Sequence, residues 1–252
     1  YVVLADCHTA ANVDYAPILQ AHAESGADVT MAYHRGTVPA LADIPQIQTD
    51  AAGRVTDMLI GRLEARQACY GAGIYVMGRE WLMRTVREAV ARNQYHFERD
   101  ILQGRLRELK IHGCELTGTL MPIYSLDSFY RANLALLDPA VREGLFPKTR
   151  PVYTKVRDCA PAQYGLHAAV TNSLVADGAR IDGTVRNSVI FRGVSIARDA
   201  VLEDCVIMQD VTVDSGCVLK CIVADKNAVF RSGRTLQGFE SYPVYVAKDT
   251  IV

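Results

Sequence analysis

The residue Asp6 closes the first apolar run of the chain, which reads YVVLADCH. Open α/β sheets bind ligands at the carboxyl ends of their strands, so a carboxylate in this position can hold a divalent cation. The same position also suits a polar residue that caps a strand end and binds nothing. Both interpretations of Asp6 stay open. His8 also has two interpretations, either as a residue of the site or as a surface residue that makes hydrogen bonds.

The glycines of GAGIYVMG, residues 71–78, have a different role from those of a phosphate-binding loop. They fall inside an apolar strand pattern, whereas a G-x-G-x-x-G loop leads directly into a helix. We therefore expect these glycines to permit close backbone approach. The seven cysteines are scattered and include no C-x-x-C pair, which predicts reduced thiols and neither a zinc site nor a disulfide framework.

Short apolar runs alternate with helical patterns over residues 1–150, which predicts an α/β domain. Strands are expected at residues 2–5, 28–34 and 68–77, with a hairpin over 44–60 that turns at Asp50–Gly53. Helices are expected at Tyr15–Ser25, Arg79–Arg92, Phe97–Leu109 and Asp127–Leu137. Asp14 is expected to cap the first of these helices and Gly26 to end it.

The pattern changes near residue 170, where two sixfold ladders begin. The first consists of Ile190, Ile196 and Leu202 and, after one five-residue step, Ile207, Val213 and Leu219. The second runs two residues earlier through Ser188, Val194, Ala200, Cys205, Val211 and Cys217. Such ladders predict a parallel β-helix, in which six residues are expected to form two short faces of a triangular coil. Antiparallel strands with period two are the alternative, but they explain only the alternation.

We expect three segments: an α/β domain at 1–150, a Pro-rich and basic linker at 151–169 and the β-helix at 170–252. The 27 basic and 28 acidic residues give a net charge of −1, which argues against nucleic acid and membrane surfaces as partners. No apolar stretch approaches the roughly 20 residues that cross a bilayer, so a cytoplasmic location is expected. The first residue, Tyr1, already lies in a strand pattern, and an upstream segment is expected.

Four strings, taken in order, resemble one family: GAGIYVM, YHFERDIL, LDSFYRANLALL and TNSLVADGARIDGTVRNSVIFRGV. The chain resembles bacterial glucose-1-phosphate adenylyltransferase, also called ADP-glucose pyrophosphorylase, and most of all the D-type regulatory subunits of glycogen synthesis. The resemblance implies a partial, Rossmann-like nucleotidyltransferase domain followed by a left-handed parallel β-helix of hexapeptide repeats. It also implies Mg²⁺ as the cofactor of the active enzymes, which join glucose 1-phosphate to ATP and release pyrophosphate.

The chain departs from the active members at three positions that the resemblance marks as catalytic. Near Asp6 the spacing is one residue longer than in the family, so Cys7 is a competing occupant of the metal-ligand position. Gly61 stands where the sugar-phosphate lysine is expected, with Arg62 as a displaced positive charge. Pro122 stands at the second metal-binding acid, counted back from Arg131 in LDSFYRAN. We therefore expect no metal site and no cofactor in this chain.

These departures favour a subunit that is inactive by itself and assembles with a catalytic subunit, in a heterotetramer. The resemblance also implies a sugar-phosphate effector bound by basic residues near the domain junction, for which Lys220 and Lys226 are the candidates, or else solvated side chains. A catalytically competent sugar-1-phosphate nucleotidyltransferase is the alternative function. A hexapeptide acyltransferase is a weaker one, because the coils lack a histidine after His167.

Overall fold

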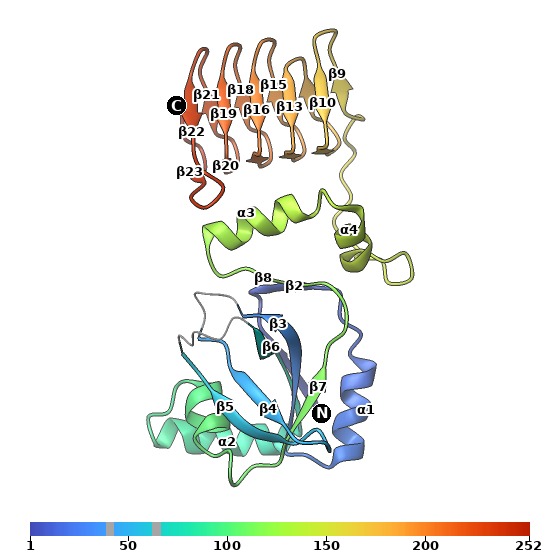
Figure 1. The fold of residues 1–252 in the computed structure, drawn as a ribbon, viewed down its shortest axis with the longest axis vertical. Helices are drawn as coiled ribbons and strands as arrows, with labels where there is room; N and C mark the ends of the chain where they lie inside the picture. Colours follow the sequence, from blue (N-terminus) through green and yellow to red (C-terminus); the bar gives the residue numbers. More distant parts are fainter. Residues whose placement is uncertain (39–42, 62–66) are drawn as a thin grey trace. The chain divides into compact units, whose positions relative to one another are not determined.

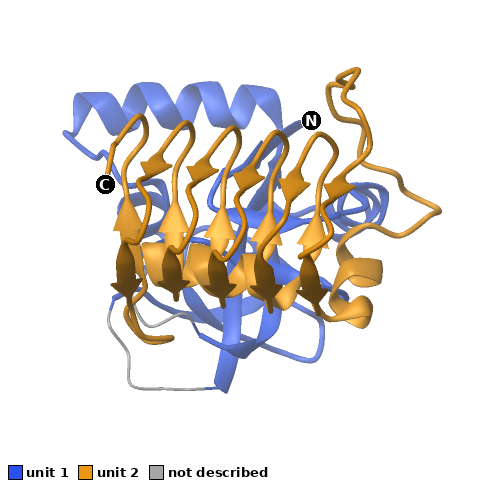
Figure 2. Ribbon diagram, turned by 90° about the horizontal axis from the view of Figure 1, so that it is seen from above, with its two compact units in different colours: residues 1–124 blue, residues 125–252 orange. Residues whose placement is uncertain are grey.

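The computed structural model describes residues 1–38, 43–61 and 67–252 (Figure 1). The chain divides into two compact units, residues 1–124 and residues 125–252 (Figure 2). The domain limits expected near residues 150 and 170 rest on changes in sequence pattern and not on contacts between residues, and they stay a prediction. Within the described residues, no helix has the length and apolar character that a membrane span requires.

The first unit is built on a mixed β-sheet. Its strands are β1 (Val2–Ala5), β3 (Val29–Thr37), β4 (Gln46–Thr49), β5 (Val55–Leu59), β6 (Gln67–Met77) and β7 (Ile111–Glu115). The order is β5-β4-β6-β3-β7, and β1 also pairs with β6. Strands β3 and β7 are parallel, and the other pairs are antiparallel. The expected strands and the hairpin are therefore confirmed. A separate antiparallel ribbon joins β2 (Thr9–Ala11) to β8 (Leu120–Pro122).

Apolar side chains pack on both faces of this sheet, because successive residues of a strand point to opposite faces. On one face Ala32 and Ile74 pack with Ile18 of α1 (Ala16–Ser25). On the other face Met31 and Tyr75 belong to the cluster that includes residues of α2 (Arg79–Ala91). The sheet is thus the middle layer of an α/β unit, as the sequence predicts.

The first helix begins one residue later than expected, with Tyr15 and not Asp14 at the N-cap position. Its first residue, Ala16, donates its backbone N–H to the Asp14 carboxylate at 3.0 Å. Gly26 ends the helix with φ +56°, a left-handed conformation that favours glycine. The helix expected at Phe97–Leu109 differs: a π-helix, η1, covers Phe97–Gln103, and turns follow it. The Asp100 carboxylate accepts the backbone N–H groups of Tyr95 and His96 at 3.0 Å each, which fixes the start of this short element.

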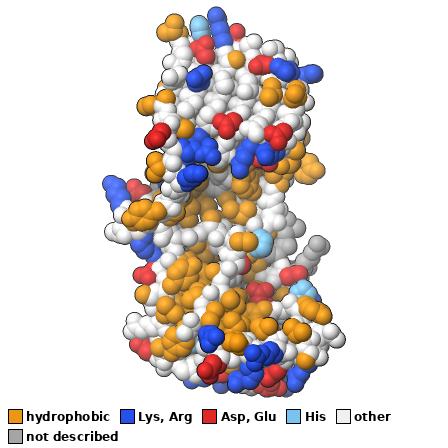
Figure 3. Space-filling model, turned by 180° about the vertical axis from the view of Figure 1, so that it is seen from behind, with side chains coloured by type: hydrophobic (Ala, Val, Ile, Leu, Met, Phe, Trp, Pro, Cys, Tyr) orange, Lys and Arg blue, Asp and Glu red, His pale blue; other side chains and the backbone are white. Residues whose placement is uncertain are grey.

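Helix α2 carries apolar residues on two sides. Leu82 and Ala89 pack into the core of the unit. Met83, Val86 and Val90 are spaced for one helix face and are exposed by 40%, 50% and 64%. Figure 3 shows apolar side chains gathered over much of one face of this unit. An amphipathic helix normally leaves only polar residues on its outer side, so this face of α2 is unusual for a free surface.

The second unit contains three five-stranded parallel sheets, and every strand pairs with a strand in a neighbouring coil (Figure 2). One sheet consists of β9 (Gln163–Tyr164), β12 (Arg180–Ile181), β15 (Ser195–Ile196), β18 (Thr212–Val213) and β21 (Val229–Phe230). Another consists of β10 (Ala169–Thr171), β13 (Thr184–Arg186), β16 (Val201–Glu203), β19 (Val218–Lys220) and β22 (Thr235–Gln237). The third consists of β11 (Leu174–Val175), β14 (Val189–Ile190), β17 (Val206–Ile207), β20 (Ile222–Ala224) and β23 (Val244–Val246). The expected parallel β-helix is therefore confirmed.

The coil geometry corrects one detail of the expectation. Successive members of the first ladder, Ile190, Ile196 and Leu202, lie in β14, β15 and β16, which belong to three different sheets. Six residues therefore form one face of the coil and not two. Val201 pairs with Val218, 17 residues later, so two six-residue steps and one five-residue step complete a turn.

Both ladders point into the coil. All members of the first ladder are exposed by at most 2%, and those of the second are fully buried. The single polar member, Ser188, is satisfied there, because its hydroxyl donates to the Arg186 carbonyl and accepts the Cys205 backbone N–H. Small residues in one ladder leave room for the aliphatic residues of the other, which is the packing that the sequence predicts.

Two helices precede the coils within this unit. Helix α3 (Leu126–Ala135) begins at Ser125, which forms a capping box with Ser128. Its residue Tyr130 is fully buried with Val206 and Val223, and its Oη donates to the Asp204 carbonyl at 2.8 Å. The sequence analysis missed α4 (Pro139–Leu145), although the signal was present in Asp138, whose carboxylate accepts the Ala140 N–H at 2.8 Å, and in the proline that follows it.

Candidate functional site

Two adjoining cavities of the first unit, of about 420 and 260 Å³, meet at Asp6. Both are lined by Asp6, Gly73 and Glu98. The larger one is also lined by His8, Asp43, Ile44, Pro45, Gly71 and Tyr124, and the smaller one by Leu4, Ala5, Tyr75 and Phe97. Asp6 thus lies at the end of β1 and faces a hollow, where the sequence analysis expected either a ligand or a strand cap.

The Asp6 carboxylate is held by its neighbours in the sheet. The backbone N–H of Asp6 donates to the Gly73 carbonyl at 2.9 Å, and Oδ1 of the Asp6 carboxylate accepts the His8 N–H at 3.0 Å. Gly73 has φ +69°, and a Cβ at this position would stand 2.0 Å from Oδ2 of Asp6. A glycine is therefore required here by both backbone conformation and space. The close approach at this glycine is made by the Asp6 side chain and not, as expected, by another stretch of backbone.

A second carboxylate, Glu98, reaches the same cavities from the π-helix. Tyr75 Oη donates a hydrogen bond to Oε1 of Glu98, and Phe97 packs edge-to-face on the Tyr75 ring. Burial raises the pKa of Glu98, the charge of Asp6 raises it further, and the Tyr75 hydrogen bond opposes them. Burial, followed by the charge of Glu98, also raises the pKa of Tyr75 well above its usual value.

Glu98 was not predicted as a site residue, although it lies in the string YHFERDIL that resembles the family. A π-helix of seven residues is too short for an apolar period to reveal which side chain points inward. The one available signal was chemical, since an acid directly follows an aromatic residue in a string that resembles the family. Asp43, the third acid of the larger cavity, lies in an irregular segment and gave no signal at all.

The chain around Pro122 runs beside this site. Pro122 pairs with Thr9 in the β2–β8 ribbon, and Ile123 donates its N–H to the His8 carbonyl at 2.6 Å. Tyr124 stacks on the His8 ring at 5.4 Å between centroids. Pro122, at the position that the resemblance assigns to a metal-binding acid, therefore pairs with Thr9 next to this site but lines neither cavity.

The charge of these cavities is unusual for phosphate chemistry. Their described lining residues include three acids, Asp6, Asp43 and Glu98, and neither lysine nor arginine. Within the described residues, no group of three or more His, Cys, Asp or Glu side chains is arranged to hold a metal ion. Mg²⁺ prefers an octahedral set of hard oxygen ligands, and Glu98 already accepts a hydrogen bond from Tyr75. Because Mg²⁺ is commonly held by one or two carboxylates together with water and substrate phosphates, the expectation of no metal site stays a prediction.

Two other expected positions, Gly61 and Cys7, do not line the cavities. Gly61 follows β5, has open space around its Cα and φ +129°, and does not line them. Arg62 falls outside the described residues. Cys7, the competing occupant of the metal-ligand position, is exposed and does not line them either.

The two candidate effector lysines lie on different parts of the coil. Lys220 ends β19, and its Nζ donates to Oε1 of Glu203 at 3.2 Å. That hydrogen bond raises the pKa of Lys220. Lys226 is exposed in the turn after β20, beside Asp225, whose Oδ1 accepts the Lys226 N–H at 2.7 Å. The structure does not bring the two ammonium groups to one face, and their effector role stays a prediction.

The architecture itself defines a class of protein. An α/β unit with an acid at a strand end, followed by a hexapeptide β-helix, is the arrangement of nucleotidyltransferase-like proteins that carry a β-helix domain. A family model described as GlmU-like, C-terminal hexapeptide, matches residues 159–239 and supports the second half of this definition.

Curated relatives match along most of the chain. The glycogen biosynthesis protein GlgD of Geobacillus stearothermophilus is 32% identical over 202 residues, which cover 80% of this chain and 49% of that protein. GlgD of Bacillus subtilis (strain 168) is 27% identical over the whole chain and 63% of that protein. Glucose-1-phosphate adenylyltransferase of Shewanella amazonensis is 27% identical over 94% of the chain and 61% of that protein. The chain is a relative of the glucose-1-phosphate adenylyltransferase family, as its sequence indicates, and it spans about half to two thirds of the length of these relatives.

Proposed function

We propose that the chain is part of a non-catalytic regulatory subunit of glucose-1-phosphate adenylyltransferase in glycogen synthesis. In this proposal it acts in the cytoplasm through assembly with a separate catalytic subunit, in a heterotetramer that a sugar phosphate regulates. The names of its relatives, which are glycogen biosynthesis proteins and glucose-1-phosphate adenylyltransferases, support the pathway and the family reaction.

The observation that carries the non-catalytic part is the charge of the cavities at Asp6. Transfer of a nucleotidyl group needs cations, from metal ions or side chains, that hold the phosphates and neutralise the charge that develops on them. The described lining offers three acids and no basic side chain, and Pro122 replaces one acid that the resemblance assigns to the metal. Acids without a basic side chain in the described lining disfavour a sugar phosphate and a nucleoside triphosphate alike.

The second unit supports the assembly part. Its sheets are already paired from coil to coil, so their outer faces can pack against another protein without edge-to-edge aggregation. In the first unit, the exposed apolar residues Met83, Val86 and Val90 of α2 form a surface of the kind that protein contacts cover.

Mixing the protein with a catalytic subunit of the family tests the proposal. We expect no ADP-glucose from the protein alone, and a changed rate, substrate affinity or effector response when both are present. Size-exclusion chromatography with light scattering should show a joint species in the same mixture. An unchanged rate, affinity and effector response, together with separate elution, would contradict the proposal.

The alternative, a catalytically competent sugar-1-phosphate nucleotidyltransferase, has one observation in its favour. Asp6 and Glu98 line the same two cavities, so two carboxylates are present even though Pro122 is not an acid. Under this alternative the protein alone releases pyrophosphate with ATP, glucose 1-phosphate and Mg²⁺, and both Asp6→Asn and Glu98→Gln abolish the release. Under our proposal there is no release to abolish.

A further inference from the structure

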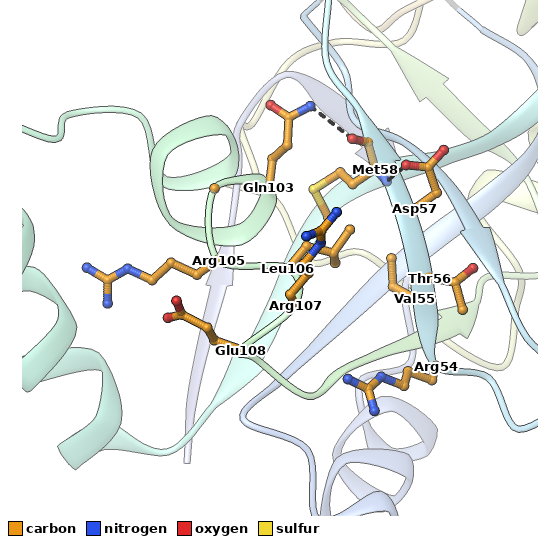
Figure 4. Close-up of a pocket in the computed structure, with 11 residues that line it drawn as sticks. Arg54, Val55, Thr56, Asp57, Met58, Gln103, Arg105, Leu106, Arg107 and Glu108 are labelled. Carbon is orange, nitrogen blue, oxygen red and sulfur yellow. Dashed lines mark hydrogen bonds between the residues drawn. The ribbon is translucent and has the colours of Figure 1, made fainter.

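A third cavity of the first unit, of about 810 Å³, lies between the edge strand β5 and the segment 103–108 (Figure 4). Its lining consists of residues 54–58 on one side and residues 103–108 on the other. Gln103 closes the cavity at one end, because its Nε2 donates to the Met58 carbonyl at 2.9 Å. The volume lies in the range of small-molecule sites.

The floor of this groove is apolar, and the backbone N–H and carbonyl of Met58 in β5 both have hydrogen-bond partners. Val55 and Met58 are both 2% exposed, and Leu106 faces them from the opposite segment. The Met58 N–H donates to Oδ1 of Asp57 at 2.9 Å, and its carbonyl accepts from Gln103. This part of the strand edge therefore needs no further polar partner, and a ligand would find apolar contact there.

Three arginines and two acids line the groove, but their surroundings differ. Arg105 bonds Oε2 of Glu88 at 3.2 Å and extends away from β5 in Figure 4. Glu108 lies on the same side as Arg105 in that view, and the Asp57 carboxylate is bonded to the backbone of Met58. Arg105 and Glu108 therefore direct their charge away from β5, whereas the Asp57 carboxylate keeps a negative charge on the β5 wall.

Arg54 and Arg107 remain, one on each wall. Both are exposed, and within the described residues neither guanidinium has an ion pair or a hydrogen bond to a side chain. The backbone of Arg54 is fixed, because its N–H donates to Oδ1 of Asp50 at 2.9 Å and its carbonyl accepts the Asp50 N–H. Two guanidinium groups without a side-chain partner among the described residues thus border a groove with an apolar floor.

We propose that this groove binds a small phosphorylated metabolite, with Arg54 and Arg107 on its phosphate and Val55, Met58 and Leu106 against the rest of the molecule. The planar guanidinium fork matches phosphate oxygens in pairs, and it loses less freedom on binding than a lysine does. This site goes beyond the function proposed above, because it uses neither the cavities at Asp6 nor a partner subunit.

Calorimetric titration of the whole chain tests the site with three probes: inorganic phosphate, glycerol 3-phosphate and uncharged glycerol. We expect the phosphate ester to bind more tightly than phosphate, and glycerol not to bind. Arg54→Gln and Arg107→Gln should each weaken binding of the ester about tenfold, the scale of one charge-assisted hydrogen bond. Arg79→Gln, an exposed arginine of α2 outside the groove, removes the same charge and should leave binding unchanged.

Circular dichroism would confirm that each variant keeps its fold. Absence of ester binding to the wild-type chain overturns the proposal. The proposal is also overturned if the Arg54 and Arg107 variants bind the ester as tightly as the wild type does. Equal affinity for phosphate and its ester overturns the metabolite part, since the apolar floor would then contribute nothing. None of these results depends on ADP-glucose formation, so the site and the regulatory function can fail separately.

Discussion

The backbone of Gly73 leaves the space that the Asp6 carboxylate fills: a Cβ on residue 73 would stand 2.0 Å from Oδ2 of Asp6. Sheet pairing between β1 and β6 brings the two residues together, and a hydrogen bond of 2.9 Å joins the Asp6 N–H to the Gly73 carbonyl. The acid at the strand end is therefore built into the sheet, whether or not it has kept a chemical role.

Gly73→Ala should destabilise the first unit by about 1–3 kcal/mol, because φ +69° is strained for alanine and the new methyl group meets Asp6. Urea unfolding followed by fluorescence of the single tryptophan, Trp81, reports on this unit. Gly26→Ala is the matched control, since it has φ +56° but only the flexible Lys110 Nζ at 4.0 Å. Adding Asp6→Ala to Gly73→Ala should recover part of the loss. A Gly73 variant no worse than the Gly26 variant would contradict the clash.

Glu98→Gln should change how stability depends on pH. Burial raises the pKa of Glu98 in the folded chain, so the folded state holds this proton more tightly than the unfolded state. The wild type therefore loses stability as pH rises from the unfolded pKa through the folded pKa. The Gln variant does not lose stability in this way. Its free energy of unfolding should therefore exceed that of the wild type by little in acid and by the largest amount at neutral pH. Denaturant unfolding at several pH values measures the difference.

The companion variant Tyr75→Phe tests the cause of the same shift. The Tyr75 hydrogen bond opposes burial and lowers the pKa of Glu98, so its removal should raise that pKa further. Titration of the Glu98 carboxyl carbon by NMR reads the change directly. An unchanged or lower pKa would mean that the hydrogen bond does not act as described.

Ser188→Ala should destabilise the β-helix by about 1–3 kcal/mol, because it leaves the Cys205 N–H and the Arg186 carbonyl buried with one partner fewer. Ser188→Cys should cost less. Cys205, one coil later in the same ladder, donates its Sγ to the Glu203 carbonyl at 3.1 Å in the same manner. Thermal unfolding by circular dichroism compares the variants. Equal losses for Ala and Cys would rule out the hydrogen bond as the reason for a polar residue in this ladder.

The thiols should divide sharply in reactivity. Cys7 and Cys159 are exposed, whereas Cys205, Cys217 and Cys221 are buried, and burial raises the pKa of Cys205 to about 12. Iodoacetamide at pH 8 should modify the first two in the folded chain and the other three only after unfolding in urea. Mass spectrometry of the peptides identifies each site, and rapid modification of Cys205 without urea would contradict the buried ladder.

Much of the fold was predictable, because its signals are local. The central strand, the hairpin at Asp50, and the end of the first helix at Gly26 follow from apolar runs and turn residues. The errors lie where local signals are weak. The π-helix at Phe97–Gln103 carries no clear period, and α4 is only seven residues long. The number of faces in a coil also depends on which strands pair, which the ladder spacing does not state.

By itself, the sequence determined the parallel β-helix, the order of the α/β elements and the relationship to the adenylyltransferase family, since periodicity and motif strings survive without coordinates. Only the tertiary structure decided which side chains meet. It placed Glu98 in the cavities of Asp6, although 92 positions separate them, and set Arg54 and Arg107 on opposite walls of one groove. Such encounters arise from strand pairing and helix packing between distant segments, and no spacing along the chain records them.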